Sequence, residues 1–287
     1  MSVFCTWPIF ALLMPMAFNG NCEQIGYDFQ IHFQRFLLEA WAKFEKPCPN
    51  GTKMLILTLS RRDGFDKRRG IRTWMKDAVF GEELRFLVSD PSKDEANDVQ
   101  QKLDEEQKEH GDLWYGGLVW QQRHCAETEW VAKVDDDIAV HLQRLNQWID
   151  KKFRKNAAEN PLVYIGIGGN PRPKRDPDNK WYVSYETYSR ELFPPYVYGG
   201  CYLTTAATVK AVMALTHKTN GFFLDDVLYT GVLGELANAI VLDQPMHFEF
   251  EAKTECVDHV PTLFSIWNAK NGDETIENYE KLKAMKC

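Results

Sequence analysis

Short apolar runs recur along the chain and are separated by longer stretches in which polar residues dominate. Each run is rich in Leu, Ile or Val and only a few residues long, which is the pattern of strands buried on both faces of a sheet. The predicted strands are residues 53–60, 83–89, 129–134, 161–169 and 239–243.

The polar stretches carry apolar residues at helical spacing. In residues 138–153, Leu142, Leu145 and Ile149 form one stripe that Phe153 continues. The predicted helices are residues 28–44, a stretch that ends near Val79, residues 92–110, residues 138–153, a helix capped by Thr204 or Thr205 that ends near His217, and residues 225–239. Strands that alternate with helices predict an α/β fold with a largely parallel sheet.

Composition fits one large folded domain. The chain has 287 residues, of which 44% are apolar and 26% are charged, and it shows no internal repeat, low-complexity tract or convincing linker. The net charge of −7 argues against a general nucleic-acid binder, which would usually show a basic face. An acidic chain can still hold a local basic pocket for an anionic ligand.

The N-terminal stretch is apolar. Residues 3–18 carry no charge, and their length is at the lower limit for a membrane span, although two prolines weaken a helix there. We favour entry into the secretory pathway, with residues 1–20 as a cleaved signal peptide or an uncleaved signal-anchor that attaches the chain to the membrane. The alternative is a buried core helix. Residues 21–52 are expected to form a stem, and residues 53–287 the folded domain.

Two further features agree with that compartment. Asn50 begins the N-glycosylation triplet NGT, and the chain has seven cysteines. If Cys5 in the apolar stretch is set aside, the others can pair as disulfides in more combinations than the sequence can resolve. The alternative is that several of them are buried thiols.

Three consecutive aspartates follow the predicted strand of residues 129–134. Because side chains two positions apart in an extended chain share a face, Asp135 and Asp137 are expected to point the same way, and Asp136 the other way. Two carboxylates at the carboxyl end of a strand can bind a hard divalent cation, which would remove their repulsion and offer a counter-charge to phosphate. The alternative is a solvated acidic turn.

Residues 180–205 combine aromatic residues, prolines and glycines. We interpret the part that reads FPPYVYGGCY as a rigid turn, in which Gly199 and Gly200 allow close backbone approach. Trp181 and Tyr196 offer faces on which a sugar ring can stack. An ordinary aromatic core is the alternative.

A second pair of carboxylates, Asp225 and Asp226, begins the predicted helix of residues 225–239. An aspartate in this position is commonly a helix cap. The functional interpretation makes one of them a general base whose pKa the helix terminus lowers. Gly231 and Gly234 each cost the helix about 1 kcal/mol relative to Ala, which indicates that something packs closely against them.

These segments, in this order, resemble the inverting β1,3-galactosyltransferase family, whose members transfer galactose or N-acetylglucosamine from UDP-sugars in the Golgi. The resemblance covers roughly residues 53–267 and rests on stretches that read RRGIRTW, KVDDDIAV, KWYVS…FPPYVYGGCYLTT, LDDVLYTGV and CVDHVPTLFSIW. It implies a single GT-A-like domain, Rossmann-like, with a mostly parallel sheet flanked by helices. It also implies a single-pass type II protein of the Golgi membrane.

Carried over by position, the resemblance implies a Mn²⁺ site and a donor site. Asp135 and Asp137 would bind Mn²⁺ with His259 as the third ligand, and His247 competes for that third place. The residues that would meet the donor's uridine, ribose or pyrophosphate are Arg69, Arg72, Asp135 and Asp136.

The resemblance also implies the acceptor side and the reaction. Asp226 would be the catalytic base, Asp225 would orient the acceptor, and Trp181 and Tyr196 would line its subsite. The acceptor 3-hydroxyl would lose its proton to Asp226 and attack the anomeric carbon in one displacement with inversion. Mn²⁺ would stabilise the UDP leaving group. The implied partners are UDP-galactose or UDP-N-acetylglucosamine and a glycan acceptor on a glycoprotein or glycolipid.

The chain departs from the family at two places. The segment between Asp112 and Trp130 is shorter and lacks the helical stretch usual there, and one residue is missing between Arg72 and Thr73. These gaps support the alternative function, a catalytically weak relative that acts as a folding partner or glycan binder in the secretory pathway. The retained metal carboxylates favour the enzyme.

Overall fold

The structure is a computed structural model that describes residues 47–88, 99–100, 110–219, 223–250 and 255–287. The chain divides into two compact units, Met1–Glu45 and Lys46–Cys287, and the first lies outside the described residues. The predicted signal segment, the predicted helix of residues 28–44 and most of the predicted stem therefore lie outside them too. Within the described ranges, no helix is long and apolar enough to cross a membrane.

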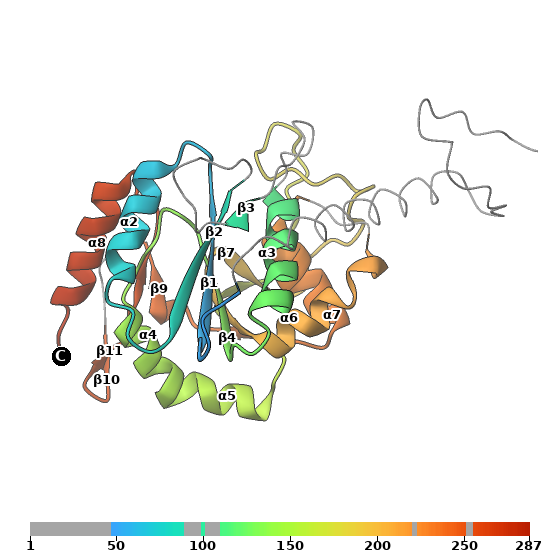
Figure 1. The fold of residues 1–287 in the computed structure, drawn as a ribbon. Helices are drawn as coiled ribbons and strands as arrows, with labels where there is room; N and C mark the ends of the chain where they lie inside the picture. Colours follow the sequence, from blue (N-terminus) through green and yellow to red (C-terminus); the bar gives the residue numbers. More distant parts are fainter. Residues whose placement is uncertain (1–46, 89–98, 101–109, 220–222, 251–254) are drawn as a thin grey trace, which may run out of the picture. The chain divides into compact units, whose positions relative to one another are not determined.

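A seven-stranded sheet forms the centre of the second unit (Figure 1), with the strand order β3-β2-β1-β4-β7-β6-β8. Its strands are β1 (Met54–Ser60), β2 (Glu82–Val88), β3 (Val99–Gln100), β4 (Trp130–Val134), β6 (Val163–Gly169), β7 (Tyr196–Thr205) and β8 (Ile240–Asp243). The pairs β1–β2, β1–β4, β2–β3 and β6–β8 are parallel. Strand β7 runs antiparallel to both of its neighbours, β4 and β6. The predicted α/β class with a mostly parallel sheet is confirmed.

Helices cover both faces of this sheet (Figure 1). One face carries α2 (Phe65–Met75), α4 (Leu142–Trp148) and α8 (Gly272–Ala284), and the other carries α3 (His110–His124), α6 (Ala206–Met213) and α7 (Leu233–Leu236). In β1, Met54 and Ile56 join the core of the first face, while Leu55 and Leu57 join the core of the second. Burial on both sides explains why this strand reads as a continuous apolar run.

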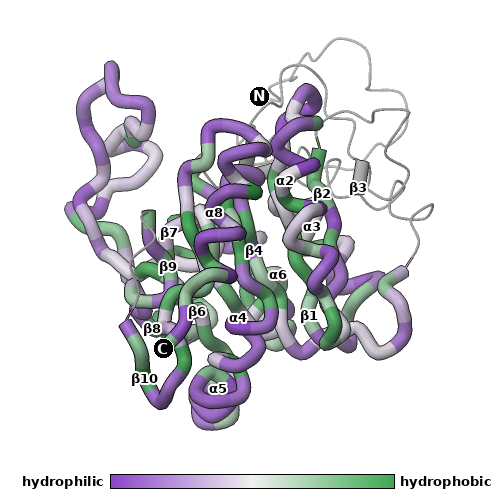
Figure 2. Tube along the Cα trace, turned by 90° about the vertical axis from the view of Figure 1, so that its left-hand side faces the viewer, coloured by the Kyte–Doolittle hydropathy of each residue, from purple (hydrophilic) through white to green (hydrophobic). Residues whose placement is uncertain are grey.

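Smaller elements complete the fold. They are β5 (Ala139–Val140), β9 (Phe248–Glu249), β10 (Cys256–Val257), β11 (Val260–Pro261), β12 (Ser265–Ile266), α5 (Arg154–Glu159) and the short turns of helix η2 (Ile149–Phe153), η3 (Thr216–Lys218), η4 (Val227–Val232) and η5 (Pro245–His247). Strands β5, β12 and β9 form a separate three-stranded sheet, and β10 pairs with β11 as a hairpin. Figure 2 shows the hydrophobic colours along the central strands β1 and β4, while α5 on the outside is hydrophilic.

Helix α8 docks against α2 through two glycines. A Cβ atom on Gly70 would lie 2.8 Å from Thr275 Cβ and 3.0 Å from Gly272 O, so only glycine fits there without a shift. The backbone N–H of Gly272 donates to Asp66 Oδ2 at 2.6 Å. Asn271 caps α8 by accepting from Glu274 N at 2.9 Å. This contact brings the C-terminal helix beside the segment that follows β1.

Two predictions of secondary structure were wrong. The segment FPPYVYGGCY enters a central strand, β7, because its backbone pairs with β4 and β6 on both sides. Residues 99–100 form β3 and are not helical, and the rest of the helix predicted over residues 92–110 lies mostly outside the described residues. Helix α3 spans much of the segment that is shorter than in the family, and it buries Trp114, Leu118 and Trp120.

Disulfides and a buried thiol both occur among the described cysteines. Cys48 pairs with Cys125, which ties the segment before β1 to the end of α3, and Cys256 pairs with Cys287. Cys201 in β7 is a buried free thiol. The two alternatives left open by the sequence therefore each hold for part of the set.

Candidate active site

The three aspartates follow β4 at the edge of the sheet where the parallel strands β1 and β4 end. Asp135 continues the pairing, because its N–H donates to Gly200 O at 2.8 Å. Asp136 and Asp137 lie in a turn that leads into β5. The loop after β1 and the start of α2 reach the same edge, as expected where strands run parallel.

An internal cation, Lys133, lies in the middle of this acidic cluster. Its side chain is 3% exposed, and its Nζ lies 3.1 Å from Asp135 Oδ1 and 3.2 Å from Asp225 Oδ2. The same Nζ donates to Gly199 O at 2.6 Å. Burial alone would lower the pKa of Lys133, but Asp135, Asp225 and Asp226 raise it above its ordinary value. Lys133 therefore stays protonated and joins the two carboxylate pairs.

Asp135 forms this ion pair and is also partly exposed to solvent. Burial in the surrounding protein raises the pKa of Asp135 to about 7 against the opposing effect of Lys133, and the charges of Asp225 and Asp137 raise it further. The side chain is still 38% exposed at the edge of the sheet. An external cation can therefore reach this carboxylate.

Asp136 and Asp137 share a second lysine. Lys67 Nζ lies 3.4 Å from Asp136 Oδ1 and 3.7 Å from Asp137 Oδ2. Asp136 Oδ2 also accepts from Ser60 Oγ at 2.7 Å. Because Asp136 and Asp137 lie in a turn, the extended conformation ends at Asp135, and the strict alternation of side chains on which the prediction relied ends there too.

Arg68 contacts the serine that hydrogen-bonds to Asp136. It is fully buried and donates to Ser60 Oγ at 3.0 Å, and the same hydroxyl donates to Asp136. The basic residues of α2 that reach the carboxylates are thus Lys67 directly and Arg68 through Ser60.

The predicted arginines lie elsewhere. Arg69 pairs with Asp66 at 2.6 Å and with Asp273 at 2.7 Å, on the exposed side of α2 that faces α8. Arg72 is exposed and lies over the ring of Phe86, 4.8 Å from its centroid. The ion pairs of Arg69 are therefore with Asp66 and Asp273 and not with the aspartates that follow β4.

Asp226 begins η4 and is held by two backbone donors. Val227 N donates to Asp226 Oδ1 at 2.8 Å, and Gly199 N donates to Asp226 Oδ2 at 3.0 Å. The prediction that the helix terminus lowers its pKa was wrong. Burial and the adjacent charge of Asp225 outweigh Lys133 and these donors, and raise the pKa of Asp226 to about 6.

Gly199 meets the predicted need for close approach. A Cβ atom there would lie 3.0 Å from Lys133 Nζ and 3.2 Å from Asp226 Cβ. A side chain at this position would therefore push the lysine and the second carboxylate pair apart. Gly200 is equally constrained, because its Cβ would lie 2.8 Å from the ring of Trp267.

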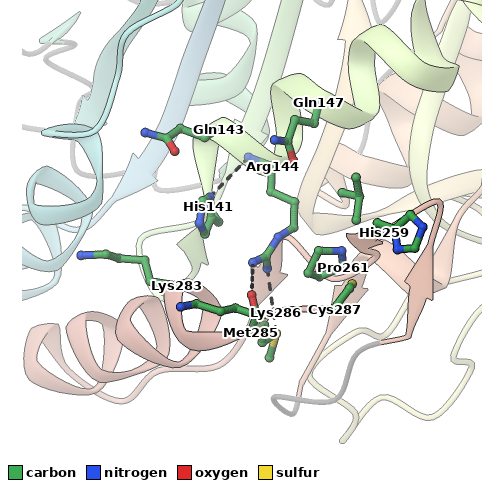
Figure 3. A pocket seen from close by; sticks show the side chains of 11 residues that line it. His141, Gln143, Arg144, Gln147, His259, Pro261, Lys283, Met285, Lys286 and Cys287 are labelled. Carbon is green, nitrogen blue, oxygen red and sulfur yellow. Dashed lines mark hydrogen bonds between the residues drawn. The ribbon is translucent and has the colours of Figure 1, made fainter.

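The structure does not bring His259 to the aspartates. His259 lies in the turn between β10 and β11 and lines a different pocket, together with His141 and Pro261 (Figure 3). The C-terminal segment instead brings Trp267 to Gly200, and Ala269 N donates to Asp137 O at 2.9 Å. Among the residues described, no three His, Cys, Asp or Glu side chains are grouped to hold a metal ion. The three-ligand set is therefore not assembled.

The competing candidate, His247, is a core residue. Its Nδ1 lies 2.7 Å from Thr262 O, and its ring stacks on Phe264 with centroids 5.3 Å apart. Burial lowers the pKa of His247 to about 4. It holds β9 against the C-terminal segment and does not face the aspartates.

The predicted acceptor residues and the glycosylation residue occupy different environments. Tyr196 is buried at the start of β7, and the nearby charge of Asp226 together with burial raises its pKa. Trp181 is exposed on the loop between β6 and β7, within reach of Lys180, whose Nζ lies 4.5 Å from the ring centroid. Asn50 lies exposed in a turn before β1.

Sequence reasoning missed the lysine at the centre. Lys133 lies inside an apolar strand, and a lysine is almost never buried without a partner. That rule alone indicates that carboxylates converge on it. Which carboxylates do so depends on the pairing of β4 with β7, which places Gly199 and Asp226 beside it.

The chain is similar in sequence to known glycosyltransferases. Residues 115–244 match the family model described as galactosyltransferase. The chain is 22% identical over 262 residues to lactosylceramide 1,3-N-acetyl-beta-D-glucosaminyltransferase A of Danio rerio, a match that covers 79% of this chain and 68% of the relative. It is 26% identical over 203 residues to beta-1,3-galactosyltransferase 5 of Pan troglodytes, covering 64% of this chain and 66% of the relative. The chain thus spans about two thirds of these relatives.

The chain also has a neighbour among solved structures. It is a glycosyltransferase involved in the glycosylation of the major capsid of PBCV-1, with a TM-score of 0.39 and 15% identity over 79% of this chain and 98% of that chain.

Proposed function

The chain belongs to the galactosyltransferase family, whose model matches residues 115–244, and from this premise we propose that it is a hexosyltransferase. It transfers galactose or N-acetylglucosamine from a UDP-sugar to the 3-hydroxyl of a glycan acceptor, with inversion at the anomeric carbon. Both sugars appear in the names of the similar proteins.

The observation that carries the proposal is that one carboxylate from each of two pairs, Asp135 and Asp225, contacts Lys133. The pair of Asp135 and Asp137 is partly exposed and follows β4, and the pair of Asp225 and Asp226 begins η4. A transferase with two substrates needs one site that binds the donor's diphosphate, here through a cation, and another group that takes the acceptor's proton. The two pairs, joined by the buried Lys133, meet that requirement.

The residues at the first pair suit a divalent cation. Asp135 and Asp137 offer hard oxygen ligands and are 38% and 32% exposed. Burial raises the pKa of Asp137, and the neighbouring charge of Asp136 raises it further, so the cluster carries excess negative charge that a cation would relieve. When bound, Mn²⁺ would act as a Lewis acid that stabilises charge on the leaving diphosphate. Lys67, 3.4 Å from Asp136, is available to add to that stabilisation.

The second pair carries the proton transfer. Asp226 accepts the proton of the acceptor 3-hydroxyl as the bond from that oxygen to the anomeric carbon forms and the bond from this carbon to the diphosphate breaks. With a pKa raised to about 6, Asp226 is mostly ionised at neutral pH and is a stronger base than an ordinary aspartate. The N–H groups of Gly199 and Val227 fix its orientation, and Asp225 orients the acceptor.

The test is a donor panel. The soluble domain is incubated with a set of UDP-sugars and Mn²⁺, and the release of UDP is measured with and without sugar acceptors. We expect one donor to give release that depends on an acceptor, and the Asp137→Ala variant to lose it. If no donor yields UDP above the level of Asp137→Ala, the proposal fails.

One observation favours a second candidate, a family relative that binds glycans or assists folding without transferring sugar. Trp267 packs against Gly200, whose carbonyl accepts from Asp135 N, whereas His259 lies in the turn between β10 and β11. A chain of this kind would bind a glycan acceptor in the panel experiment, measured by calorimetry, while releasing no UDP from any donor.

We further propose that the protein works in the Golgi lumen or membrane. Two disulfides, Cys48–Cys125 and Cys256–Cys287, are typical of proteins that mature in an oxidising compartment. Asn50 stands in an exposed turn that a glycosylating enzyme can reach. Digestion of the secreted protein with an N-glycosidase, compared with the Asn50→Gln variant, tests this placement.

A further inference from the structure

A pocket of about 340 Å³ lies apart from the two carboxylate pairs (Figure 3). Its walls come from three places: the start and middle of α4, the β10–β11 hairpin and the end of α8. None of the four carboxylates at the candidate active site lines it. The pocket is therefore a separate feature, which the proposed transferase reaction does not use.

The pocket concentrates positive charge in an acidic protein. Its ionisable side chains are His141, Arg144, His259, Lys283 and Lys286, and neither Asp nor Glu lines it. The whole chain carries a net charge of −7, so this basic set is a local feature and not a reflection of composition. In Figure 3, Arg144 lies between His141 and Lys283 on one side and His259 on the other.

Arg144 supplies a buried cation at this pocket. The residue is 4% exposed, and its guanidinium donates to Leu263 O at 2.6 Å and to Leu282 O at 2.9 Å. Burial lowers the pKa of Arg144, and no carboxylate among the described residues acts against that effect. A buried guanidinium that is satisfied by carbonyls alone keeps its charge uncompensated, which is costly. An anion in the pocket would offset that cost.

The charged side chains that line the pocket affect the pKa of His141. Burial lowers the pKa of His141 to about 4, and Arg144 and Lys283 lower it further, against the opposing effect of Asp77. Glu280 Oε1 lies 3.3 Å from Lys283 Nζ, and Asp258 pairs with Lys151 at 3.2 Å. Glu280 therefore offsets part of the charge of Lys283, whereas Asp258 pairs with Lys151, which does not line the pocket.

The walls are held in place. The disulfide between Cys256 and Cys287 joins the hairpin to the end of the chain after α8. At the tip of the hairpin, Asp258 and His259 have φ of 49° and 60°, the left-handed region that residues with side chains rarely adopt. A turn held in this conformation keeps His259 at the rim of the pocket.

We propose that this pocket binds an oxyanion, a sulfate or phosphate group that is either free or esterified to a sugar. Protonated nitrogen donors bind such oxygens through short, charge-assisted hydrogen bonds. Lys283, Lys286 and His259 provide donors at the opening, while Arg144 provides the positive field at the base.

The test uses calorimetry on the full chain with three probes: sodium sulfate, sodium phosphate and galactose 6-sulfate. We expect saturable binding and, in nuclear magnetic resonance spectra, shifts of the ring protons of His141 and His259. The double variant Lys283→Gln/Lys286→Gln should weaken binding at least about tenfold, since charge-assisted hydrogen bonds are roughly twice as strong as neutral ones. The matched control, Lys155→Gln/Lys210→Gln, removes the same charge from exposed sites on α5 and α6.

The three probes distinguish an anion attached to a sugar from a free anion. If the sugar ester binds at least as tightly as inorganic sulfate, the ligand is a sulfated or phosphorylated glycan; if only the inorganic probes bind, it is the free anion. Absence of saturable binding with all three probes overturns the proposal, and so does equal weakening in the two double variants. Circular dichroism of each variant verifies that the fold is retained.

Discussion

At the scale of single residues, Lys133 explains how three adjacent aspartates coexist with a second acidic pair. Its ammonium lies within 3.2 Å of both Asp135 and Asp225. The sequence alone posed this cluster as a set of repelling charges that only an external cation would relieve. In the structure, Lys133 of β4 provides an internal cation. Lys67 provides a second one, for Asp136.

Replacement of Lys133 by Met is expected to affect both folding and activity. Methionine keeps the length of the side chain but leaves Asp135 and Asp225 without their shared cation. We expect a loss of roughly 3–5 kcal/mol in the free energy of unfolding, the usual cost of breaking a buried ion pair on one side. Urea unfolding followed by circular dichroism measures it.

The matched control is Lys67→Met. Lys67 is 32% exposed, so its loss should cost no more than about 1 kcal/mol. Equal destabilisation by the two variants would contradict the central place given to Lys133.

Asp226 sets the expected dependence of transfer on pH. The base must be ionised, and burial raises its pKa to about 6. Activity should therefore be low below pH 6 and rise as the pH increases through about 6, measured as kcat/KM over pH 4.5 to about 8. Asp226→Asn should abolish transfer at every pH. A profile that stays flat down to pH 4.5 would show that Asp226 is not the base.

At the scale of elements, the two glycines predicted to pack closely in the helix after Asp226 differ in how near their neighbours lie. In η4, a Cβ on Gly231 would lie 3.1 Å from Tyr196 Cβ, whereas on Gly234 in α7 the nearest atom, of Tyr164, would be 3.5 Å away. The sequence predicted close packing at both, and only Gly231 has it. The spacing of residues along a helix does not show which residue of another element packs against each position.

The docking of α8 on α2 gives a direct test. Gly70→Ala should destabilise the fold by roughly 1–3 kcal/mol, because the new methyl group would lie 2.8 Å from Thr275 Cβ and 3.0 Å from Gly272 O. Gly234→Ala is the control, since its methyl group meets ordinary contacts and gains helix propensity of up to about 1 kcal/mol. Thermal unfolding of both variants decides the matter. A Gly70→Ala protein as stable as the control would contradict the packing.

At the scale of the whole molecule, a buried histidine makes stability depend on pH. The folded pKa of His247 is lowered to about 4 from 6.5, so unfolding takes up a proton between these values. The stabilisation from neutral His247 is fully present above pH 6.5 and is lost as the pH falls toward 4. Aspartates with raised pKa values act in the opposite direction, so wild type must be compared with a variant that lacks only the histidine.

His247→Asn should therefore show a weaker loss of stability between pH 7 and pH 5 than wild type, by about 2 kcal/mol. Urea unfolding at both pH values measures the difference, and the asparagine amide can replace the contact with Thr262. Because the variant lacks ring contacts, the ring resonances of His247 in the wild type give an independent check. A midpoint of their titration near 6.5 would contradict the prediction.

The sequence by itself determined the α/β class, most of the parallel strands and the two carboxylate pairs. Strands buried on both faces must be apolar throughout, and that signal is local. It also narrowed the cap of α6 to Thr204 or Thr205, of which Thr205 accepts from Thr208 N at 3.1 Å. These features depend on neighbours within a few residues, so they can be read along the chain.

Only the tertiary structure decided which charges meet. The antiparallel insertion of β7 between β4 and β6 brings Gly199 and Asp226 to Lys133, and the path of the C-terminal segment brings Trp267 to Gly200 and the backbone of Ala269 to Asp137. Such contacts join residues far apart in the chain, and their energies depend on burial and distance. No local pattern of residues encodes either quantity, which is why the sequence could not place Lys133 between Asp135 and Asp225 or His259 in a separate pocket.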